Sequence, residues 1–209
     1  MDDAALDTRP LGPEDLGDLA SLFQPERNTR GCWCMSFCSS RTQFAMGWLT
    51  GGNRRRFEAM ASGAGPPMGV LASVSGQPVG WCACGPRSRY AVADEGRSAL
   101  LQGLDRTDDD DVWLLPCLFV RAESRGQGVT YGLVEAAVEL ARQHGARAIE
   151  GWPTAGSQKR SAEGFVGRER VFEALGFRCV ARPSSARAIM RLELDGAPEG
   201  DQRNASRTP

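Results

Sequence analysis

The sequence predicts a single α/β domain built on a mixed central sheet of six to seven strands and flanked by about four helices. Two observations carry this prediction. Apolar segments short enough for strands alternate with segments of helical period, and the segment VWLLPCLFV at 112–120 is apolar on both faces, as in a central strand. The length of 209 residues suits one domain, and 41% hydrophobic residues can supply its core.

The predicted elements follow one another without an internal repeat. Strands are expected at 6–11, 69–75, 78–84, 112–120, 147–151, 177–182 and 187–194, and helices at 13–23, 54–62, 129–144 and 168–175. Pro13 and the acids after it open the first helix, Asn53 caps the second, and Gly145 and Gly176 end the last two. A further short helix is expected near 97–104. Residues 1–5 are expected to be loose and 195–209 a disordered tail, so that the domain spans 6–194.

The turn between the central strand and the next helix is the candidate ligand site. There, Arg125-Gly126-Gln127-Gly128 precedes the helix, whose free N–H groups and dipole attract an anion. Glycines allow a positive φ and close approach of the backbone, and Arg125 adds a planar cation suited to phosphate. Thr130 could add a hydroxyl donor. The pattern predicts a bound pyrophosphate, the alternative being a glycine-softened turn with a solvated arginine.

The segment RGQGVT resembles the acyl-CoA-binding motif of the GNAT superfamily of N-acetyltransferases, Arg/Gln-x-x-Gly-x-Gly/Ala. Arg125, Gly128 and Thr130 carry the resemblance, although Thr130 replaces the usual Gly or Ala. Farther on, FEALGF at 172–177 resembles the helix and strand start near the family's C-terminus. The resemblance covers roughly 68–194 and implies a GNAT-like fold, in which the fourth and fifth strands splay at a bulge and the pantetheine of acetyl-CoA lies between them.

Pro116 points to a bulge independently, because a proline inside a central strand removes a ladder donor. The alternative is that it starts a shorter strand, 117–120. The resemblance implies that Leu118 and Val120 bond pantetheine through their backbones and that the amide near Cys117 or Leu118 stabilises the developing oxyanion. The implied cofactor-binding residues are Leu118, Phe119, Val120, Arg125, Gly126, Gln127, Gly128, Val129 and Thr130, with acetyl-CoA as co-substrate and no metal.

The sequence departs from the family at the group that protonates the leaving thiolate. Many GNAT enzymes have a tyrosine where Phe172 stands, and phenylalanine cannot donate a proton. A free thiol is already a fair leaving group, and Tyr90 and Tyr131 cannot be placed at the sulfur from the sequence. Glu150 is the candidate general base, the alternative being a strand-end carboxylate paired with an arginine. His144, the single histidine, is assigned to the end of a helix.

The acceptor is expected to be a primary amine of a small molecule, an aminoglycoside-like antibiotic being one candidate. In the family, the segment joining the first two helices walls the acceptor pocket, which makes Trp33 and Phe37 candidate pocket residues, with core packing as the alternative. Asp110 and Asp111, in the acidic cluster 108–111, could attract a cationic amine, the alternative being a solvated loop.

Composition and sequence pattern limit the binding partners and the cellular location that can be expected. Twenty-five basic and 26 acidic residues give a charge of −1, so no nucleic-acid partner is expected. Neither an apolar run of about 18 residues nor a signal-peptide pattern is found, so no membrane partner is expected and the location is expected to be cytoplasmic. Seven cysteines, an odd number in a chain without an export signal, are expected to be reduced thiols and not a disulfide framework. A zinc site is the alternative, but the spacings of Cys32, Cys34 and Cys38 and of Cys82 and Cys84 do not suit it. A homodimer is left open.

Three other functions remain alternatives: a protein amine acetyltransferase, a non-catalytic acyl-CoA sensor, and an NAD(P)-binding oxidoreductase. The last would use Gly126-x-Gly128 as the dinucleotide loop and Glu150 as the ribose-binding acid.

Overall fold

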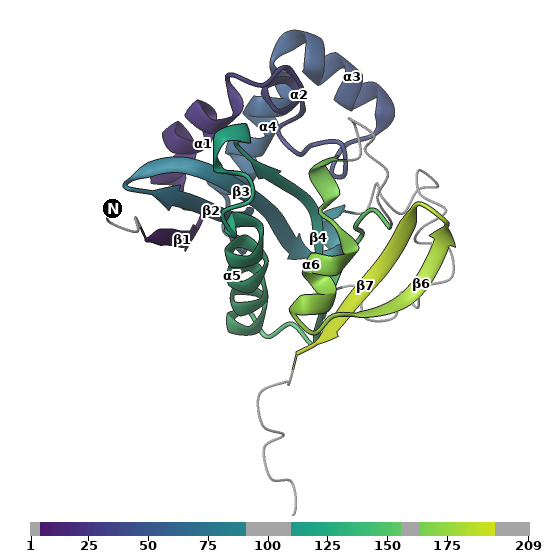
Figure 1. Ribbon diagram of the computed structural model, residues 1–209. Coiled ribbons are helices and arrows are strands. Elements are labelled where there is room, and N and C mark those ends of the chain that lie inside the picture. The colour runs from purple at the N-terminus through teal and green to yellow at the C-terminus, as the bar shows by residue number, and fades with distance from the viewer. Residues whose placement is uncertain (1–4, 91–109, 156–163, 195–209) are drawn as a thin grey trace, which may run out of the picture.

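The computed structural model describes residues 5–90, 110–155 and 164–194. The predicted tail at 195–209, the helix near 97–104 and nearly all of the loose start lie outside these residues. Within them the chain forms one seven-stranded sheet of order β1-β2-β3-β4-β5-β7-β6, which confirms the predicted mixed sheet (Figure 1). The strands are β1 (Leu6–Pro10), β2 (Gly69–Val74), β3 (Gln77–Pro86), β4 (Val112–Val120), β5 (Ala148–Gly151), β6 (Arg178–Ser184) and β7 (Arg187–Glu193).

Helices cover both faces of the sheet. Figure 1 shows α5 (Val129–Gln143) and α6 (Glu169–Ala174) on one face, with the remaining helices gathered beyond the other face. These are α1 (Leu16–Phe23), α2 (Arg27–Cys32), α3 (Arg41–Thr50) and α4 (Gly52–Ala61). The described residues therefore hold six α-helices where about four were predicted. The extra pair escaped prediction because α2 has only six residues and α3 leaves Met46 and Leu49 exposed, so neither shows an apolar stripe.

Asn53 does not cap α4 as predicted. The helix starts after Gly51, which takes a φ of +70°, and Asn53 lies buried in the first turn. Its Nδ2 donates to the carbonyl of Gly31 at 2.9 Å and to that of Phe44 at 3.2 Å. The side chain thus ties α4 to α2 and α3 and holds the helical layer together.

The sheet separates two apolar cores. Leu133 and Ala137 of α5 and Phe172 of α6 pack with Ile149 and Leu118 on one face. Phe23, Trp33 and Phe57 of the helical layer pack with Trp81 and Phe119 on the other face, which we call the helical-layer face. Side chains of β4 enter both cores, Trp113, Leu115 and Leu118 the first and Cys117 and Phe119 the second, as in a strand buried on both sides.

The sheet opens at Pro116. In the β3–β4 register, Ala83 pairs with Cys117 and Gly85 with Leu114, which leaves one extra residue on β4 and so a bulge at Leu115–Pro116. On the other side, β4 and β5 pair in parallel only from Val112 to Leu115, whose partner is Gly151. Residues 116–120 lie beyond this pairing. The structure confirms the predicted splay, and because β4 starts at Val112, Pro116 does not begin a shorter strand.

The strand directions exclude the dinucleotide-binding alternative. In the described sheet, β4 and β5 form the one parallel pair, and the other five pairings are antiparallel. A dinucleotide-binding fold requires a mostly parallel sheet. Among the helices of the described ranges, none is long and apolar enough to cross a membrane.

Candidate functional site

The loop between β4 and α5 leaves an open surface at the start of a long helix. Gly126 and Gly128 have φ values of +79° and +81°, a conformation that glycine adopts without strain. A Cβ added at either glycine would meet nothing within 4 Å. Gly128 is the N-cap residue of α5, so the backbone just ahead of the helix can be approached closely by a ligand.

This loop also presents a run of unused donors. Within the described part of the chain, the backbone N–H groups of residues 126–130 have no hydrogen-bond partner, and the first paired amide is that of Tyr131, which donates to Gly128 O at 2.9 Å. The dipole of the 15-residue helix adds partial positive charge at the same place. Arg125 is held against the loop because its Nε donates to the Val120 carbonyl at 3.1 Å. Donors, dipole and cation are together the features that favour the binding of an anion such as a pyrophosphate.

Leu118 and Val120 turn their backbone groups toward the gap between β4 and β5. The amide of Arg121 donates to Val79 on β3 at 2.9 Å. Because the direction of backbone groups alternates along an antiparallel strand, Phe119 and Cys117 also face β3, whereas Leu118 and Val120 face the opposite side. β5 pairs with this side of β4 only as far as Leu115, so the strand edge beyond Leu115 is not paired with β5. The edge can therefore pair with a chain of amides such as pantetheine, and of the two predicted oxyanion donors it favours the N–H of Leu118 over that of Cys117.

The ring of Phe172 closes the inner end of this gap. It is fully buried and packs edge-on against Phe177, with ring centroids 5.1 Å apart. A Cβ at Gly151 would collide with the ring, and a Cβ at Gly167 would lie 2.9 Å from Leu118 Cδ1 and 3.0 Å from Phe172 Cε2. Gly151 and Gly167 thus leave space for the apolar ring of Phe172, at the position where many GNAT enzymes have a tyrosine.

Glu150 is held by two arginines. Its carboxylate is fully buried, with one oxygen accepting from Arg87 Nη2 at 2.7 Å and the other from Arg191 Nη1 at 2.9 Å. Both oxygens are thereby engaged, which favours the arginine-paired alternative over the general-base role that the sequence suggested. We call Arg87, Glu150 and Arg191, which meet at the buried Glu150, the buried ion triad. Arg191 is partly exposed and also pairs with Glu193, its Nε lying 2.6 Å from Glu193 Oε1. The partners escaped prediction because Arg87 lies 63 residues away in the sequence.

The two predicted acceptor-pocket aromatics have different positions. Trp33 is 2% exposed, and the centroid of its ring lies 5.3 Å from that of Phe23 and 5.6 Å from that of Phe57. It therefore packs inside the helical layer, which agrees with the core-packing alternative. Phe37 instead reaches the splayed strands, where its ring lies 6.2 Å from that of Trp152, the residue that follows β5. The placement therefore supports Phe37 and not Trp33 as a pocket residue.

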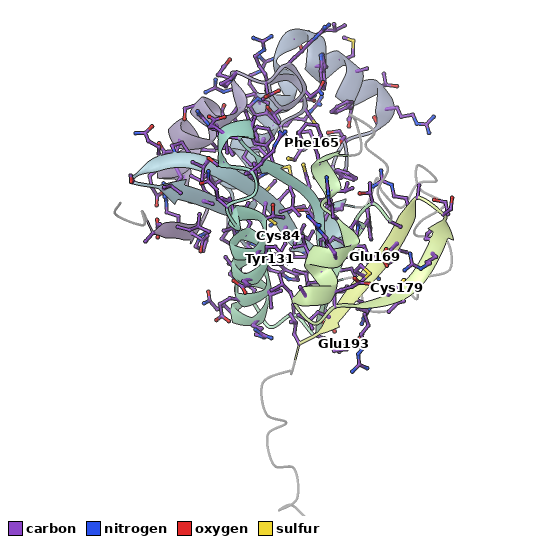
Figure 2. The ribbon with its side chains drawn as sticks, viewed as in Figure 1. Cys84, Tyr131, Phe165, Glu169, Cys179 and Glu193 are labelled. Carbon is purple, nitrogen blue, oxygen red and sulfur yellow. The ribbon has the colours of Figure 1, made fainter. Side chains whose placement is uncertain are left out.

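A second aromatic pair covers β4 beyond the bulge. Phe165 stacks on Phe119 with ring centroids 6.0 Å apart, and Figure 2 shows it just ahead of α6, toward the helical layer. The pair places an apolar surface beside residues 117–120 on the helical-layer face.

Two further buried side chains on the helical-layer face have unused polar atoms. Tyr90 and Trp152 are 2% and 3% exposed and pack in one cluster with Leu114 and Ile189. Among the residues that the structure describes, neither Tyr90 Oη nor Trp152 Nε1 has a hydrogen-bond partner. Burial raises the pKa of the Tyr90 phenol well above its ordinary value, so the group stays protonated and can donate. The sequence singled out Tyr90 without placing it and gave no signal for Trp152, since an isolated tyrosine or tryptophan gives no pattern.

The cysteines of the segment 32–38 gather next to β4. The Cys34 sulfur accepts from Trp81 Nε1 at 3.3 Å, and the Cys117 thiol donates to it as well; together these donors lower the pKa of Cys34 in spite of its burial. Burial raises the pKa of Cys32 to about 11 and that of Cys38 to about 12. All seven cysteines are free thiols, as predicted. No group of three or more His, Cys, Asp or Glu side chains in the described ranges is placed to hold a metal ion.

The remaining predicted residues lie away from the gap. Asp110 and Asp111 are exposed just before β4, and at ~3.3 Å per residue Asp111 is about 13 Å from Leu115, where the gap begins. Their place does not support a role in binding the acceptor. The other acids of the cluster lie outside the described residues. His144 follows α5, and its Nδ1 lies 2.9 Å from the Leu140 carbonyl, which confirms its assignment to a helix end.

Comparison with known proteins decides the family. The model of the acetyltransferase (GNAT) family matches residues 35–177, more than half of the chain. The chain belongs to the GNAT family of acetyltransferases. It is thus an acyl-CoA-dependent N-acyltransferase by family, and the sequence resemblance is confirmed. A search of curated proteins gives no match.

Solved GNAT structures share the fold at low sequence identity. A GNAT acetyltransferase from Streptococcus pneumoniae is 14% identical with a TM-score of 0.53, covering 91% of this chain and 99% of its own. A GCN5-related N-acetyltransferase from Kribbella flavida is 16% identical with a TM-score of 0.52, covering 91% and 98%. The yncA protein from Salmonella typhimurium, solved with its cofactor acetyl-CoA, is 14% identical with a TM-score of 0.51, covering 95% and 99%. At these identities the likeness concerns the fold alone.

Proposed function

We propose that this GNAT protein transfers an acetyl group from acetyl-CoA to a primary amine of a small molecule, by direct attack within a ternary complex. The observation that carries the proposal is the continuity of the site. Five unused amides at residues 126–130 adjoin the strand edge at Leu118 and Val120, and that edge runs along the gap toward Phe172. An anionic head and an amide-bearing arm of one ligand can occupy these parts together. The yncA protein, of the same fold, was solved with acetyl-CoA.

Each part of the site has a task in this reaction. Bound acetyl-CoA supplies a thioester whose carbonyl carbon accepts the amine nitrogen while the carbon–sulfur bond breaks, so that the nitrogen loses a proton and the sulfur gains one. The N–H of Leu118 donates to the carbonyl oxygen, and such donors contribute about 3–4 kcal/mol in other enzymes. Phe172 keeps water from the inner end of the gap but donates no proton. Holding the amine next to the thioester in the correct orientation supplies much of the rate acceleration.

The free thiols support a reducing compartment, and we propose the cytoplasm as the location. A protein amine as acceptor and a non-catalytic acyl-CoA sensor remain alternative functions, the second because Phe172 lacks a proton to give.

Two measurements test the proposal. Thermal denaturation with CoA, acetyl-CoA, NAD and NADP is expected to show stabilisation by the two CoA compounds alone. Release of free thiol from acetyl-CoA is then expected to require an added amine. Stabilisation by CoA without amine-dependent thiol release from any acceptor would identify a sensor, and stabilisation by NAD compounds would contradict the assignment of the loop.

A further inference from the structure

The outer face of α3 presents apolar side chains to solvent. Leu49 is 83% exposed and Met46 is 58% exposed, and the exposed Ala45 lies on the same face. Spacings of three and four residues join these positions to Thr42 and Thr50, which are also exposed. The outer face of α3 therefore carries no charge, and its centre is apolar. Large apolar side chains that gather on a surface mark a place of contact with another molecule or with a lipid bilayer.

The inner side of α3 adds two aromatic rings that also reach the surface. Phe44 and Trp48 are only half-buried, and their ring centroids lie 5.7 Å apart. Gly47 is the single buried residue of this helix. The position of α3 explains this, because the helix lies at the outer margin of the helical layer, where it packs against α2 and α4 (Figure 1). Four large apolar side chains of a ten-residue helix thus keep contact with solvent.

Three arginines flank the outer face of α3. Arg41 is the first residue of the helix and is exposed. From α4, Arg55 Nη1 donates to the carbonyl of Thr50 at 3.2 Å, and Arg56 Nη1 donates to the carbonyl of Gln43 at 3.0 Å. Guanidinium groups therefore lie near both ends of α3. Because their partners here are neutral carbonyls, the positive charges are not cancelled.

Few carboxylates balance the charge of these arginines. Residues 27–57 contain six arginines and no acidic residue, and with Glu26 and Glu58 at either end the segment has a net charge of +4. Glu58 pairs with Arg54, whose Nε lies 2.7 Å from Glu58 Oε1. Within the described part of the chain, no ion pair involves the three arginines that flank α3. The surface around α3 is therefore positively charged as well as apolar.

An anionic lipid bilayer is the partner that this combination fits. Apolar side chains of a helix at the margin of the molecule can enter the boundary between headgroups and acyl chains, where no complementary pocket is needed. Trp48 suits the same boundary, because its ring has an apolar body and a polar N–H. Guanidinium groups pair with the phosphates of anionic headgroups. A second copy of the chain fits less well, since symmetric contact would bring the arginines of one copy against those of the other.

We propose that the outer face of α3 and its three flanking arginines attach the protein peripherally to an anionic lipid bilayer, with Met46 and Leu49 entering the interface. Such binding needs neither a spanning helix nor a targeting segment, the two features on whose absence the expectation of no membrane partner rested. The surface is separate from the candidate site for CoA. Bilayer binding is thus a further function of the protein, and it does not depend on the proposed acetyl transfer.

Flotation of the full-length protein with lipid vesicles tests the proposal. Vesicles of phosphatidylcholine alone are compared with vesicles of equal parts phosphatidylcholine and phosphatidylglycerol. The partition coefficient is expected to be about tenfold or more higher on the mixed vesicles, because each arginine near an anionic surface contributes about fivefold. It is expected to fall as the salt concentration is raised, since screening weakens this attraction.

Two variants separate the apolar contribution from the charged one. Met46→Ser combined with Leu49→Ser is expected to lower the partition coefficient on the mixed vesicles about tenfold or more, because two apolar side chains no longer enter the interface. Arg41→Gln is expected to lower it about fivefold. The matched controls are Val180→Ser, at a residue that is 49% exposed, and Arg178→Gln, both on β6. Each control is expected to leave the partition coefficient unchanged.

Several outcomes would overturn the proposal. These are equal partitioning to the two kinds of vesicle, and partitioning that both α3 variants leave unchanged. Binding of soluble polyglutamate without binding of vesicles would assign the face to an acidic protein, and self-association abolished by the double serine variant, again without binding of vesicles, would assign it to a second copy. The CoA-induced thermal shift and amine-dependent thiol release are expected to be the same in all variants, so that loss of bilayer binding and loss of acetyl transfer are distinguished.

Discussion

Replacing Gly128 with glutamate and with glutamine separates charge from shape at the proposed pyrophosphate site. Both side chains project into the open space ahead of α5 and both impose a φ of +81° on a residue with a Cβ. That strain costs ~1–2 kcal/mol, against a typical total stability of about 5–15 kcal/mol, so both variants are expected to fold. The two differ only in charge.

The expected difference follows from Coulomb's law. A carboxylate about 6 Å from two phosphate charges is repelled by ~1.4 kcal/mol at the dielectric constant of water and by roughly twice that at half this value. The glutamate variant is therefore expected to bind CoA about 10- to 100-fold more weakly than the glutamine variant by isothermal titration calorimetry. The gap is expected to shrink as salt is raised, because the charges are exposed.

Gly145→Glu provides the control for strain. Gly145 follows the other end of α5, has a φ of +73°, and a Cβ there also meets nothing within 4 Å. Its CoA affinity is expected to match that of the wild type. Equal affinities of the glutamate and glutamine variants at low salt would refute the placement of the phosphates at this loop.

Three other substitutions test separate parts of the account. Glu150→Gln removes the charge between two arginines and is expected to destabilise the fold by about 3–5 kcal/mol in urea. The pH profile of kcat is expected to keep its shape, whereas loss of its acidic limb, on which a general base becomes deprotonated, would restore the general-base role. Gly151→Ala forces a Cβ into the ring of Phe172 and is expected to cost about 1–3 kcal/mol, part of which Phe172→Leu recovers; additive losses would show that the two do not share a space. A thiol reagent on the folded protein is expected to modify Cys179 rapidly and the other six cysteines slowly, since four of these are buried and Cys32 and Cys38 are half-buried thiols of raised pKa. A fast-reacting thiol in Cys179→Ser would contradict this order of reactivity.

The sequence predicted the elements whose signals are strong and local. The apolar segment 112–120 became β4 with the predicted bounds, and α5 ended one residue from its expected end. The positive φ values of Gly126 and Gly128 follow from residue type and position, and Pro116 marked the bulge because a proline cannot donate in a ladder. These features depend on a few neighbouring residues.

What escaped prediction depends on residues far apart in the chain. The arginine partners of Glu150 come from other strands and turns, and the role of Trp33 as core was decided by the packing of the helical layer. The unpartnered donors of Tyr90 and Trp152 are visible only once both are seen buried in one cluster. Tertiary packing, which periodicity does not encode, placed each of them.

Titration of the 15N-labelled protein with CoA, followed by two-dimensional NMR, tests the central claim most directly. The amides of residues 126–130, together with those of Leu118 and Val120, are expected to show the largest shifts, because these groups lack partners and face the proposed ligand. Large shifts confined to other parts of the sheet, or saturation of binding with these amides unmoved, would contradict the account.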